Sequence, residues 1–298
     1  AASVALFGRT PEALRITSAF IGTLTLVAIY FAGRNMFSPR IGALSAAILA
    51  VTFWHLALSR VAFRAIALPL VLCTMIAFIF AGLRTNALRP RMIYAALAGA
   101  AFGLNFYTYT SAQLVLPLVA LYGLSLWVGL RRELFVRYGA AAVQRRQLSV
   151  FAFVAAGLVV LAPLLFWLPH HADLYFSRAG QVSILNPAIN GGDLPGLLIT
   201  NVGKAAGMFA FQGDRIWRHN LSLRPAFDGW MASAFALGLV VCGWRWLRSW
   251  QSRFGTEILG VETNVAPQFV LLWLVTMLIP TVLAEMKLNC GSIPSSRK

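Results

Sequence analysis

Charged residues are scarce in this sequence, and acidic residues are the scarcest of them. Only 11% of the 298 residues are charged, roughly half the share of a typical soluble domain, and just 9 are Asp or Glu. So few charges cannot coat the surface of a water-soluble protein of this length. The shortage argues against an ordinary soluble domain and indicates that lipid is the solvent.

Cysteines and the familiar catalytic motifs are also missing or rare. The 3 cysteines are an odd number, and Cys73 and Cys242 lie inside apolar runs, where a thiol behaves as a small hydrophobic group. A disulfide framework is therefore not expected. The sequence contains no Walker loop, dinucleotide fingerprint, nucleophile elbow or zinc-protease motif. Those enzyme classes consequently have no support.

Long apolar runs are abundant, because 59% of the residues are apolar. Eight runs approach the roughly 20 residues that cross about 30 Å of hydrocarbon. They are Ile16 to Ala32, Ile41 to Leu58, Ala65 to Leu83, Ile93 to Phe106, Ala112 to Leu130, Ser149 to Leu168, Trp230 to Trp244 and Phe269 to Ala284. We therefore expect an all-α fold, a polytopic transmembrane helix bundle of about eight helices.

The runs divide the chain into three parts. Residues 1–168 hold six helices, 169–229 form a long extracytoplasmic loop, and 230–298 hold two helices and a tail. A loop of about sixty residues is far longer than packed helices need, which usually indicates function. Within it, the apolar stretch from Leu194 to Phe211 predicts a helix lying at the membrane interface.

Basic residues gather in alternate connections between the runs. If the segment after the first run is cytoplasmic, about half of the 25 basic residues fall in four short inner connections. The tendency of Lys and Arg to remain in short cytoplasmic loops then places the long loop outside. The net charge of +16 needs no nucleic acid, because these residues form short clusters instead of one basic face with interleaved aromatics.

A pair of arginines follows the second run. Arg60 and Arg64 are four residues apart and would share one face if the segment were helical. Guanidinium groups form forked hydrogen bonds with phosphate, and at a membrane surface the nearest phosphates belong to lipids. The pair is a candidate lipid-phosphate site, and the alternative is that both side chains merely extend to the head groups.

Residues 105–111, called the hinge below, are polar and aromatic but uncharged. Tyr107 and Tyr109 within the hinge are candidates for stacking on a sugar ring or hydrogen-bonding to it. The alternative is an aromatic belt at the membrane interface.

The long loop contains a third candidate set, Asp214, Arg218 and His219. A carboxylate, a guanidinium and an imidazole so close together can support acid–base chemistry and anion binding. Two alternatives stay open: an ordered cap of salt bridges, and a divalent metal ion held by Asp214 and a substrate phosphate. A zinc site is not favoured, because the adjacent His170 and His171 would point apart. No metal site and no resident cofactor is assigned.

Several of these segments, in their order along the chain, resemble membrane glycosyltransferases of family 39, the relatives of protein mannosyltransferases and aminoarabinose transferases. The resemblance covers most of the chain. It is carried by the segments Ala5–Arg15, Ser59–Pro69, Gly103–Tyr109 and Gly213–Asn220, and by Arg224 with Pro225.

The resemblance implies a C-type glycosyltransferase fold in a bacterial plasma membrane. Such enzymes transfer a sugar, with inversion, from a polyprenyl-phosphate carrier to an acceptor on the outer face. Arg60 and Arg64 would then hold the carrier phosphate, and Asp214, Arg218 and His219 would line the acceptor or sugar side. The expected partners are the lipid-linked donor and membrane lipids, with no nucleic acid.

Two departures from the family pattern are visible. The family's catalytic Asp lies in the first outer loop, which would precede Ala1, and we do not assign that role to Glu12, the acid nearest the start. From this, from the lack of an initiator Met and from the ending soon after an apolar run, we expect a fragment that is inactive by itself. Gln113 also stands where many relatives have an Arg after the hinge.

Two functions from other classes compete with the enzyme. A transporter or flippase for a lipid-linked or anionic solute would need charged residues near the middle of several apolar runs, and there are almost none. A membrane assembly subunit without chemistry would tolerate replacement of Asp214 and His219.

Overall fold

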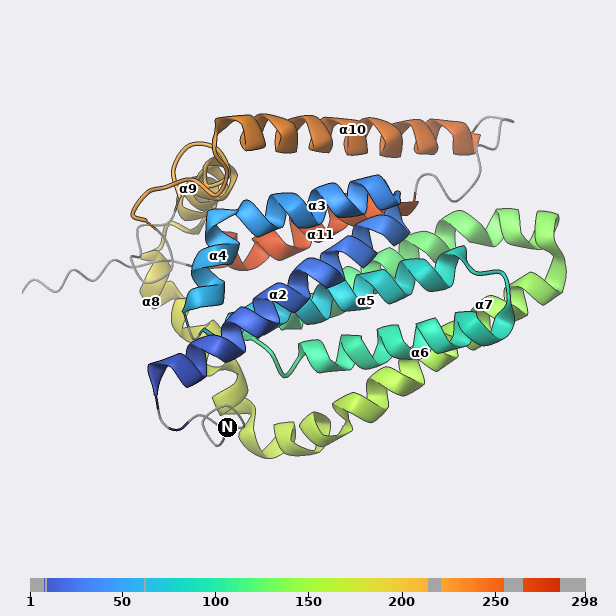
Figure 1. Cartoon of the computed structure of the whole chain (residues 1–298), viewed down its shortest axis with the longest axis horizontal. Coiled ribbons are helices and arrows are strands. Elements are labelled where there is room, and N and C mark those ends of the chain that lie inside the picture. Colours follow the sequence, from blue (N-terminus) through green and yellow to red (C-terminus); the bar gives the residue numbers. More distant parts are fainter. Residues whose placement is uncertain (1–7, 9, 62, 214–220, 255–264, 285–298) are drawn as a thin grey trace, which may run out of the picture.

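The computed structural model describes residues 8, 10–61, 63–213, 221–254 and 265–284. Nearly all of them are helical (Figure 1). The α-helices are α2 Pro11–Met36, α3 Pro39–Val51, α4 Phe53–Arg60, α5 Ala67–Arg84, α6 Leu88–Asn105, α7 Val115–Val182, α8 Pro187–Asn190, α9 Leu194–Gly207, α10 Gly229–Phe254 and α11 Val265–Leu283. Two 3₁₀ turns, η1 Arg64–Ile66 and η2 Thr110–Leu114, connect them. The described residues include one isolated β-bridge and no strand, so the all-α prediction is confirmed.

Local sequence explains where several helices begin. Thr10 and Ser38 each precede a proline, and their hydroxyl oxygens accept hydrogen bonds from Ala13 N at 3.2 Å and Ile41 N at 3.3 Å. Asp193 caps α9 in the same way by accepting from Gly196 N at 2.9 Å. A side-chain acceptor satisfies one of the free amide groups of a first turn, and proline needs no partner there.

Six helices of the described chain are long and apolar enough to cross a membrane. They are Pro11–Met36, Ala67–Arg84, Thr110–Trp127, Gln144–Asp173, Gly229–Arg248 and Val265–Leu283. The pair α3 and α4, bent by 61°, becomes a seventh if it counts as one span. The remaining expected run corresponds to α6, whose first turn contains Arg89 and Arg91 and which falls outside this set. The chain is thus a multi-pass membrane protein.

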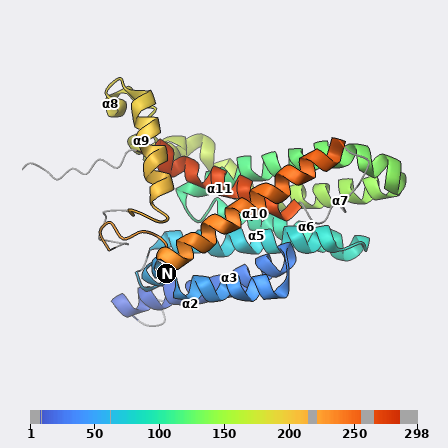
Figure 2. The ribbon, with the colours of Figure 1, turned by 90° about the horizontal axis from the view of Figure 1, so that it is seen from above.

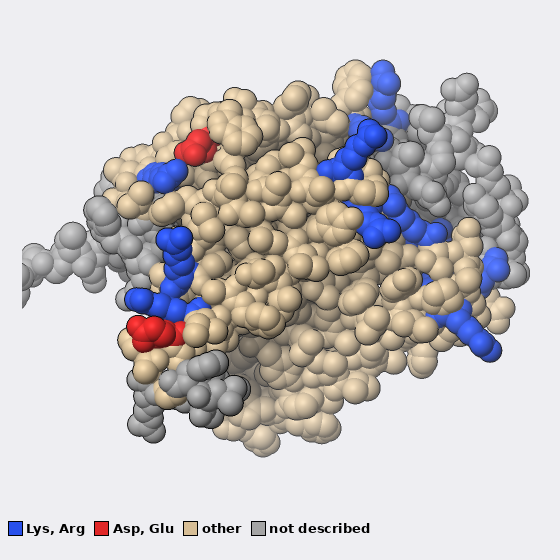
Figure 3. Space-filling model, in the orientation of Figure 1, with Lys and Arg blue, Asp and Glu red and all other residues tan. Residues whose placement is uncertain are grey.

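The long helices extend between two ends of the bundle, and α9 lies across one of them (Figures 1 and 2). Nine arginines with described side chains gather at the end that we call the basic end: Arg34, Arg40, Arg84, Arg89, Arg91, Arg145, Arg146, Arg245 and Arg248. Charge patterning had placed all nine on one side of the membrane. The carboxylates with described side chains, Glu12, Asp173, Asp193 and Asp228, lie toward the opposite end, called the hinge end, as the visible face in Figure 3 illustrates.

Helix α7 contains two of the expected runs. Its 68 residues would measure about 100 Å if straight, but the ribbon turns back at the basic end (Figure 1). Both halves therefore cross the bundle, and the second half is parallel to α6. The helix continues beyond residue 168 to Val182, so the first part of the expected long loop is helical.

Glycines bring α6 and the second half of α7 into close contact. A Cβ added to Gly99 would meet the backbone of Phe153, with the carbonyl carbon at 2.8 Å, and one added to Gly103 would lie 2.8 Å from Val160 Cβ. Without side chains at these positions, the two backbones can approach closely, as is common in membrane helices. We call this contact the glycine seam.

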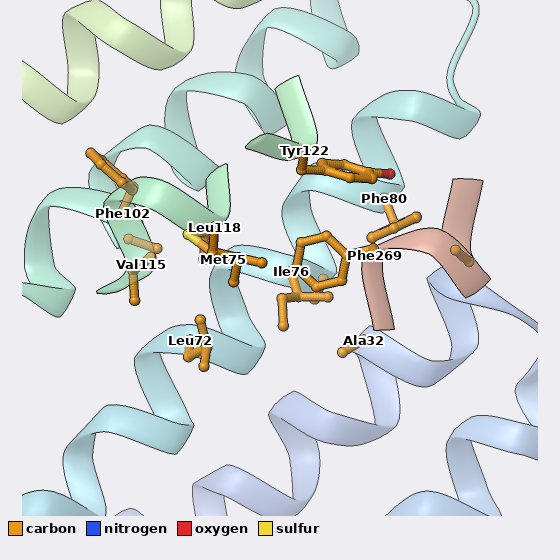
Figure 4. Packing of buried hydrophobic residues seen from close by; sticks show 13 residues of the cluster. Ala32, Leu72, Met75, Ile76, Phe80, Phe102, Val115, Leu118, Tyr122 and Phe269 are labelled. Atoms are coloured by element: carbon orange, nitrogen blue, oxygen red, sulfur yellow. The ribbon is translucent and has the colours of Figure 1, made fainter. Parts of the chain in front are cut away.

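The main hydrophobic core joins α2, α5, α6, α7 and α11. Phe80, Tyr122 and Phe269 group together in it (Figure 4), with the Tyr122 and Phe269 ring centroids 4.9 Å apart at 81° and those of Phe80 and Phe269 5.6 Å apart at 81°. These edge-to-face arrangements are favourable for aromatic pairs. The core anchors α11, near the end of the chain, to helices from its first half.

Candidate functional site

The break between α3 and α4 positions the first candidate residues. Thr52 has an extended conformation (φ −69°, ψ 123°), and its hydroxyl donates to Ile48 O at 2.7 Å. After the bend, α4 packs on α2, where His55 Nε2 lies 3.2 Å from Gly22 O. Gly22 has no side chain, and an added Cβ would collide with Ser59. The break therefore fixes the C-terminal turn of α4, which contains Arg60, at the hinge end.

Arg60 and Arg64 do not share one helix. Arg60 is in the last turn of α4 and is exposed, Val61 is extended, and Arg64 begins η1. The two arginines would share one face only if the segment were a continuous helix, and the backbone changes direction between them. The side chain of Arg64 lies outside the described residues, so the structure places its backbone alone.

The hinge lies next to this connection. The ring of Tyr109 is 6.0 Å from that of Phe63, measured between centroids, with a tilt of 59°. Phe63 directly precedes Arg64, and Tyr109 directly precedes η2. Two segments predicted separately from the sequence are therefore neighbours in the fold.

Tyr107 fastens the hinge to α7. Its hydroxyl donates to Val160 O at 2.8 Å and accepts from Leu164 N at 3.2 Å. Val160 and Leu164 are successive hydrogen-bonding positions of an α-helix, and Pro163 beside them has no N–H to donate. The hydroxyl of Tyr107 is therefore engaged by the helix backbone, whereas its side chain is 49% exposed and keeps surface for stacking.

Two side-chain amides at the hinge were not singled out as ligands from the sequence. Asn105 is fully buried, and its Nδ2 donates to Ala101 O at 2.9 Å, while its Oδ1 has no hydrogen-bond partner in the described part of the chain. Gln113 Nε2 is also buried, and it lies near the hydroxyl of Tyr175. An unsatisfied buried polar atom costs about 1–3 kcal/mol. The sequence feature that could have pointed to them is a pair of carboxamide residues, one on each side of an otherwise aromatic turn.

Tyr175, in the last part of α7, completes the surroundings of the hinge. Its hydroxyl donates to Phe106 O at 3.5 Å. Burial raises the pKa of Tyr175; the side chain of Gln113 opposes this rise, and Tyr107 adds to it. The end of α7 therefore reaches Phe106 and Gln113 from a position more than sixty residues along the chain.

The long loop is held in place on both sides of residues 214–220. Met208 O accepts from Ala226 N at 2.8 Å, Phe209 O accepts from Phe227 N at 3.0 Å, and Gly213 N donates to Leu223 O at 3.1 Å. We call the paired segments 208–213 and 223–227 the stem. The rings of Phe209, Phe227 and Phe235 group beside it, with centroids 4.8 to 5.9 Å apart. Asp214, Arg218 and His219 lie outside the described residues.

Arg224 joins the stem to the broken helix. It forms an ion pair with Asp228 at 3.3 Å, and its guanidinium lies 4.6 Å from the centroid of the Phe53 ring. Phe53 is the first residue of α4. A cation over an aromatic face contributes about 0.5–1 kcal/mol at an exposed site. Through Arg224 and Tyr109, the helix break, the hinge and the stem form one connected region at the hinge end.

Within the described chain, no three His, Cys, Asp or Glu side chains come together in a way that could hold a metal ion. His171 instead stacks on Trp167, with ring centroids 4.4 Å apart, and its Nδ1 lies 3.1 Å from Trp167 O.

Comparisons with known proteins give one match. A sequence model of the family described as dolichyl-phosphate-mannose-protein mannosyltransferase matches residues 1–167. These residues are more than half of the chain and include Arg60, Arg64, Tyr107 and Tyr109, whereas the stem and the last two helices lie beyond them. Neither a search of curated proteins nor a search of solved structures found a match.

Proposed function

The chain belongs to the dolichyl-phosphate-mannose-protein mannosyltransferase family, and from this premise we propose that it transfers a sugar at its hinge end. Membership makes it a membrane glycosyltransferase that uses a polyprenyl-phosphate-linked sugar donor. The proposed acceptor side is the extracytoplasmic face of a bacterial plasma membrane, because the basic end takes the cytoplasmic side under the positive-inside rule.

The observation that supports this site most directly is the meeting of three separate segments. Phe63 and Tyr109 bring the α4–η1 connection to the hinge, with ring centroids 6.0 Å apart, and Arg224 brings the stem to Phe53 at 4.6 Å. Irregular backbone is costly within a membrane unless it is covered by protein or lines a polar cavity. The irregular backbone of this chain is concentrated at the hinge end, which favours the hinge end as the place of the chemistry.

We assign roles by charge and position. Arg60 and Arg64 hold the carrier phosphate and stabilise the negative charge that grows on it as the sugar leaves. Tyr107 and Tyr109 offer ring faces to the sugar, and Asp214, Arg218 and His219 line the sugar or acceptor side. No catalytic base is assigned here, and an Asp upstream of Ala1 stays a prediction. A divalent ion on Asp214 and the phosphate stays an alternative.

The test compares arginines at the two ends. Arg60→Ala and Arg64→Ala in the full-length protein should lower sugar transfer from a polyprenyl-phosphate donor by about 10- to 100-fold, the usual value of a charged hydrogen bond. Arg40→Ala, which removes the same charge at the basic end, should change transfer by less than about twofold. Transfer by the Arg60 and Arg64 variants equal to that of Arg40→Ala would refute the phosphate role.

A further inference from the structure

Two arginines come together at the basic end of the glycine seam. Arg91 is half-buried in the first part of α6, and Arg145 is exposed on the neighbouring half of α7. Burial, and after it the positive charge of Arg145, lowers the pKa of Arg91. The two helices of the glycine seam are parallel, and Arg91 and Arg145 each precede the contact of Gly99 with Phe153 by eight residues, so both side chains lie at the same level of the seam. At this separation the two positive charges repel each other.

No carboxylate with a described side chain is placed to offset this repulsion. Those of Glu12, Asp173, Asp193 and Asp228 are at the hinge end. Among the described residues at the basic end, the visible face of the molecule shows basic side chains and no acidic one (Figure 3). Two positive charges held together in this way attract an anion, because a bound anion would remove the repulsion and accept hydrogen bonds from the guanidinium groups.

An apolar strip continues from Arg145 toward the middle of the bundle. Leu148 and Val159 follow Arg145 by three and fourteen residues, which places them on the same face of α7. Their exposed fractions are 36% and 74%. A cationic group at the membrane boundary followed by exposed apolar side chains matches a molecule with a charged head and a hydrocarbon chain.

We propose that Arg91 and Arg145 bind the phosphate of an anionic phospholipid in the leaflet at the basic end, with one acyl chain along Leu148 and Val159. Guanidinium groups grip phosphate oxygens with forked hydrogen bonds, and basic sites between membrane helices bind anionic head groups. A zwitterionic lipid fits less well, because its ammonium group adds a third positive charge. This site lies at the end opposite the proposed sugar-transfer site and does not depend on it.

The experiment measures bound lipid on the purified full chain by native mass spectrometry, with phosphatidylglycerol as the probe. Arg91→Gln and Arg145→Gln should each reduce the retained lipid by about tenfold, the effect of losing one charged hydrogen bond. Arg89→Gln is the matched control, because Arg89 is exposed in the same turn of α6 as Arg91. Its effect should stay below about twofold.

Two further arms identify the ligand. Phosphatidylcholine should be retained about tenfold less than phosphatidylglycerol, since only the latter carries a net negative charge. Inorganic phosphate at the same concentration should not displace the lipid, because it has no chain to contact Leu148 and Val159. Arg91→Lys keeps the charge without the fork and should retain an intermediate amount.

Three results would overturn the proposal. Equal losses in the Arg89, Arg91 and Arg145 variants would show general attraction to the basic end. Equal retention of phosphatidylcholine would show that chains alone bind, and displacement by inorganic phosphate would indicate a site for the free anion. Arg145 is exposed, so its variant keeps the test valid even if Arg91→Gln does not fold.

Discussion

The two ends of the bundle treat charge and backbone differently. At the basic end, arginines occur at regular helix ends, and Arg84 donates to Arg34 O at 3.3 Å and to Phe37 O at 3.0 Å, where it satisfies the last carbonyls of α2. At the hinge end, a helix breaks at Thr52, the buried Oδ1 of Asn105 has no hydrogen-bond partner among the described residues, and acidic and basic side chains lie side by side. Regular ends suit anchoring, whereas irregular backbone and unpaired polar groups are typical of sites that bind something else.

The glycine seam connects the two ends, and breaking it should have the largest effect. Gly99→Leu forces a side chain into the backbone of Phe153, which cannot move aside as a flexible side chain could. We expect a loss of about 3 kcal/mol or more in the free energy of unfolding. Gly123→Ala, at a position in α7 with no atom within 4 Å of the added Cβ, should change it by less than about 1 kcal/mol. Unfolding in detergent micelles measures both, and equal losses would contradict a tight seam.

A pair of asparagines compares the ends directly. Asn201 Nδ2 donates to Val282 O at 2.9 Å and to Ala284 O at 3.4 Å, which fixes α9 across the end of α11. Asn35 Nδ2, at the basic end, donates to Ala77 O alone at 2.9 Å. We expect Asn201→Ala to cost about 2 kcal/mol and Asn35→Ala about 1 kcal/mol in denaturant unfolding. A larger loss of unfolding free energy for Asn35→Ala than for Asn201→Ala would contradict this expectation.

Two tyrosines near opposite ends of α6 give a further comparison between the basic end and the hinge end. Tyr107→Phe removes the hydroxyl between Val160 O and Leu164 N and should cost about 1–2 kcal/mol. Tyr94→Phe should cost less than about 0.5 kcal/mol, because the Tyr94 ring stacks on Phe78 and its hydroxyl has no hydrogen bond in the described part of the chain. Thermal unfolding of the two variants checks this. Identical shifts in their unfolding temperatures would contradict the inference that the Tyr107 hydroxyl fastens the hinge to α7.

The smallest effect has the opposite sign. Leu223, in the stem, has a φ of +66°, a left-handed conformation that costs a side-chain-bearing residue about 1–2 kcal/mol. Leu223→Gly should therefore stabilise the protein by up to about 1 kcal/mol. Leu221→Gly, two residues earlier and without a positive φ, should destabilise it by about 0.5–1 kcal/mol. A loss of stability in Leu223→Gly would show that packing of the leucine outweighs its backbone strain.

Features with a local cause could be predicted from the sequence. Uncharged runs of sufficient length predicted the helices, and the alternation of arginines grouped Arg34, Arg84 and Arg145 on one side, the same end in the fold. The helix over Leu194–Gly207 also follows from its apolar composition and the Asp193 cap. These depend on a few neighbouring residues and on the solvent.

Features that depend on contacts between distant residues could not be predicted from the sequence. The break at Thr52 has no proline or glycine beside it, and the sequence predicted a single run from Ile41 to Leu58. The hydroxyl of Tyr107 contacts Val160, which is 53 residues later in the sequence, and Arg224 contacts Phe53, which is still more distant in the sequence. The candidate residues were thus recognisable by type, but their grouping required the fold.

The concentration of arginines at one end also gives the protein an electrical orientation. A membrane potential shifts the energy of each elementary charge moved across it by about 2.3 kcal/mol per 100 mV. With the basic end on the negative side, each of its nine described arginines resists transfer to the other face, and the acids at the hinge end resist it in the opposite direction. An energised membrane would therefore hold this chain in one orientation more firmly than an unpolarised one, even before any substrate binds.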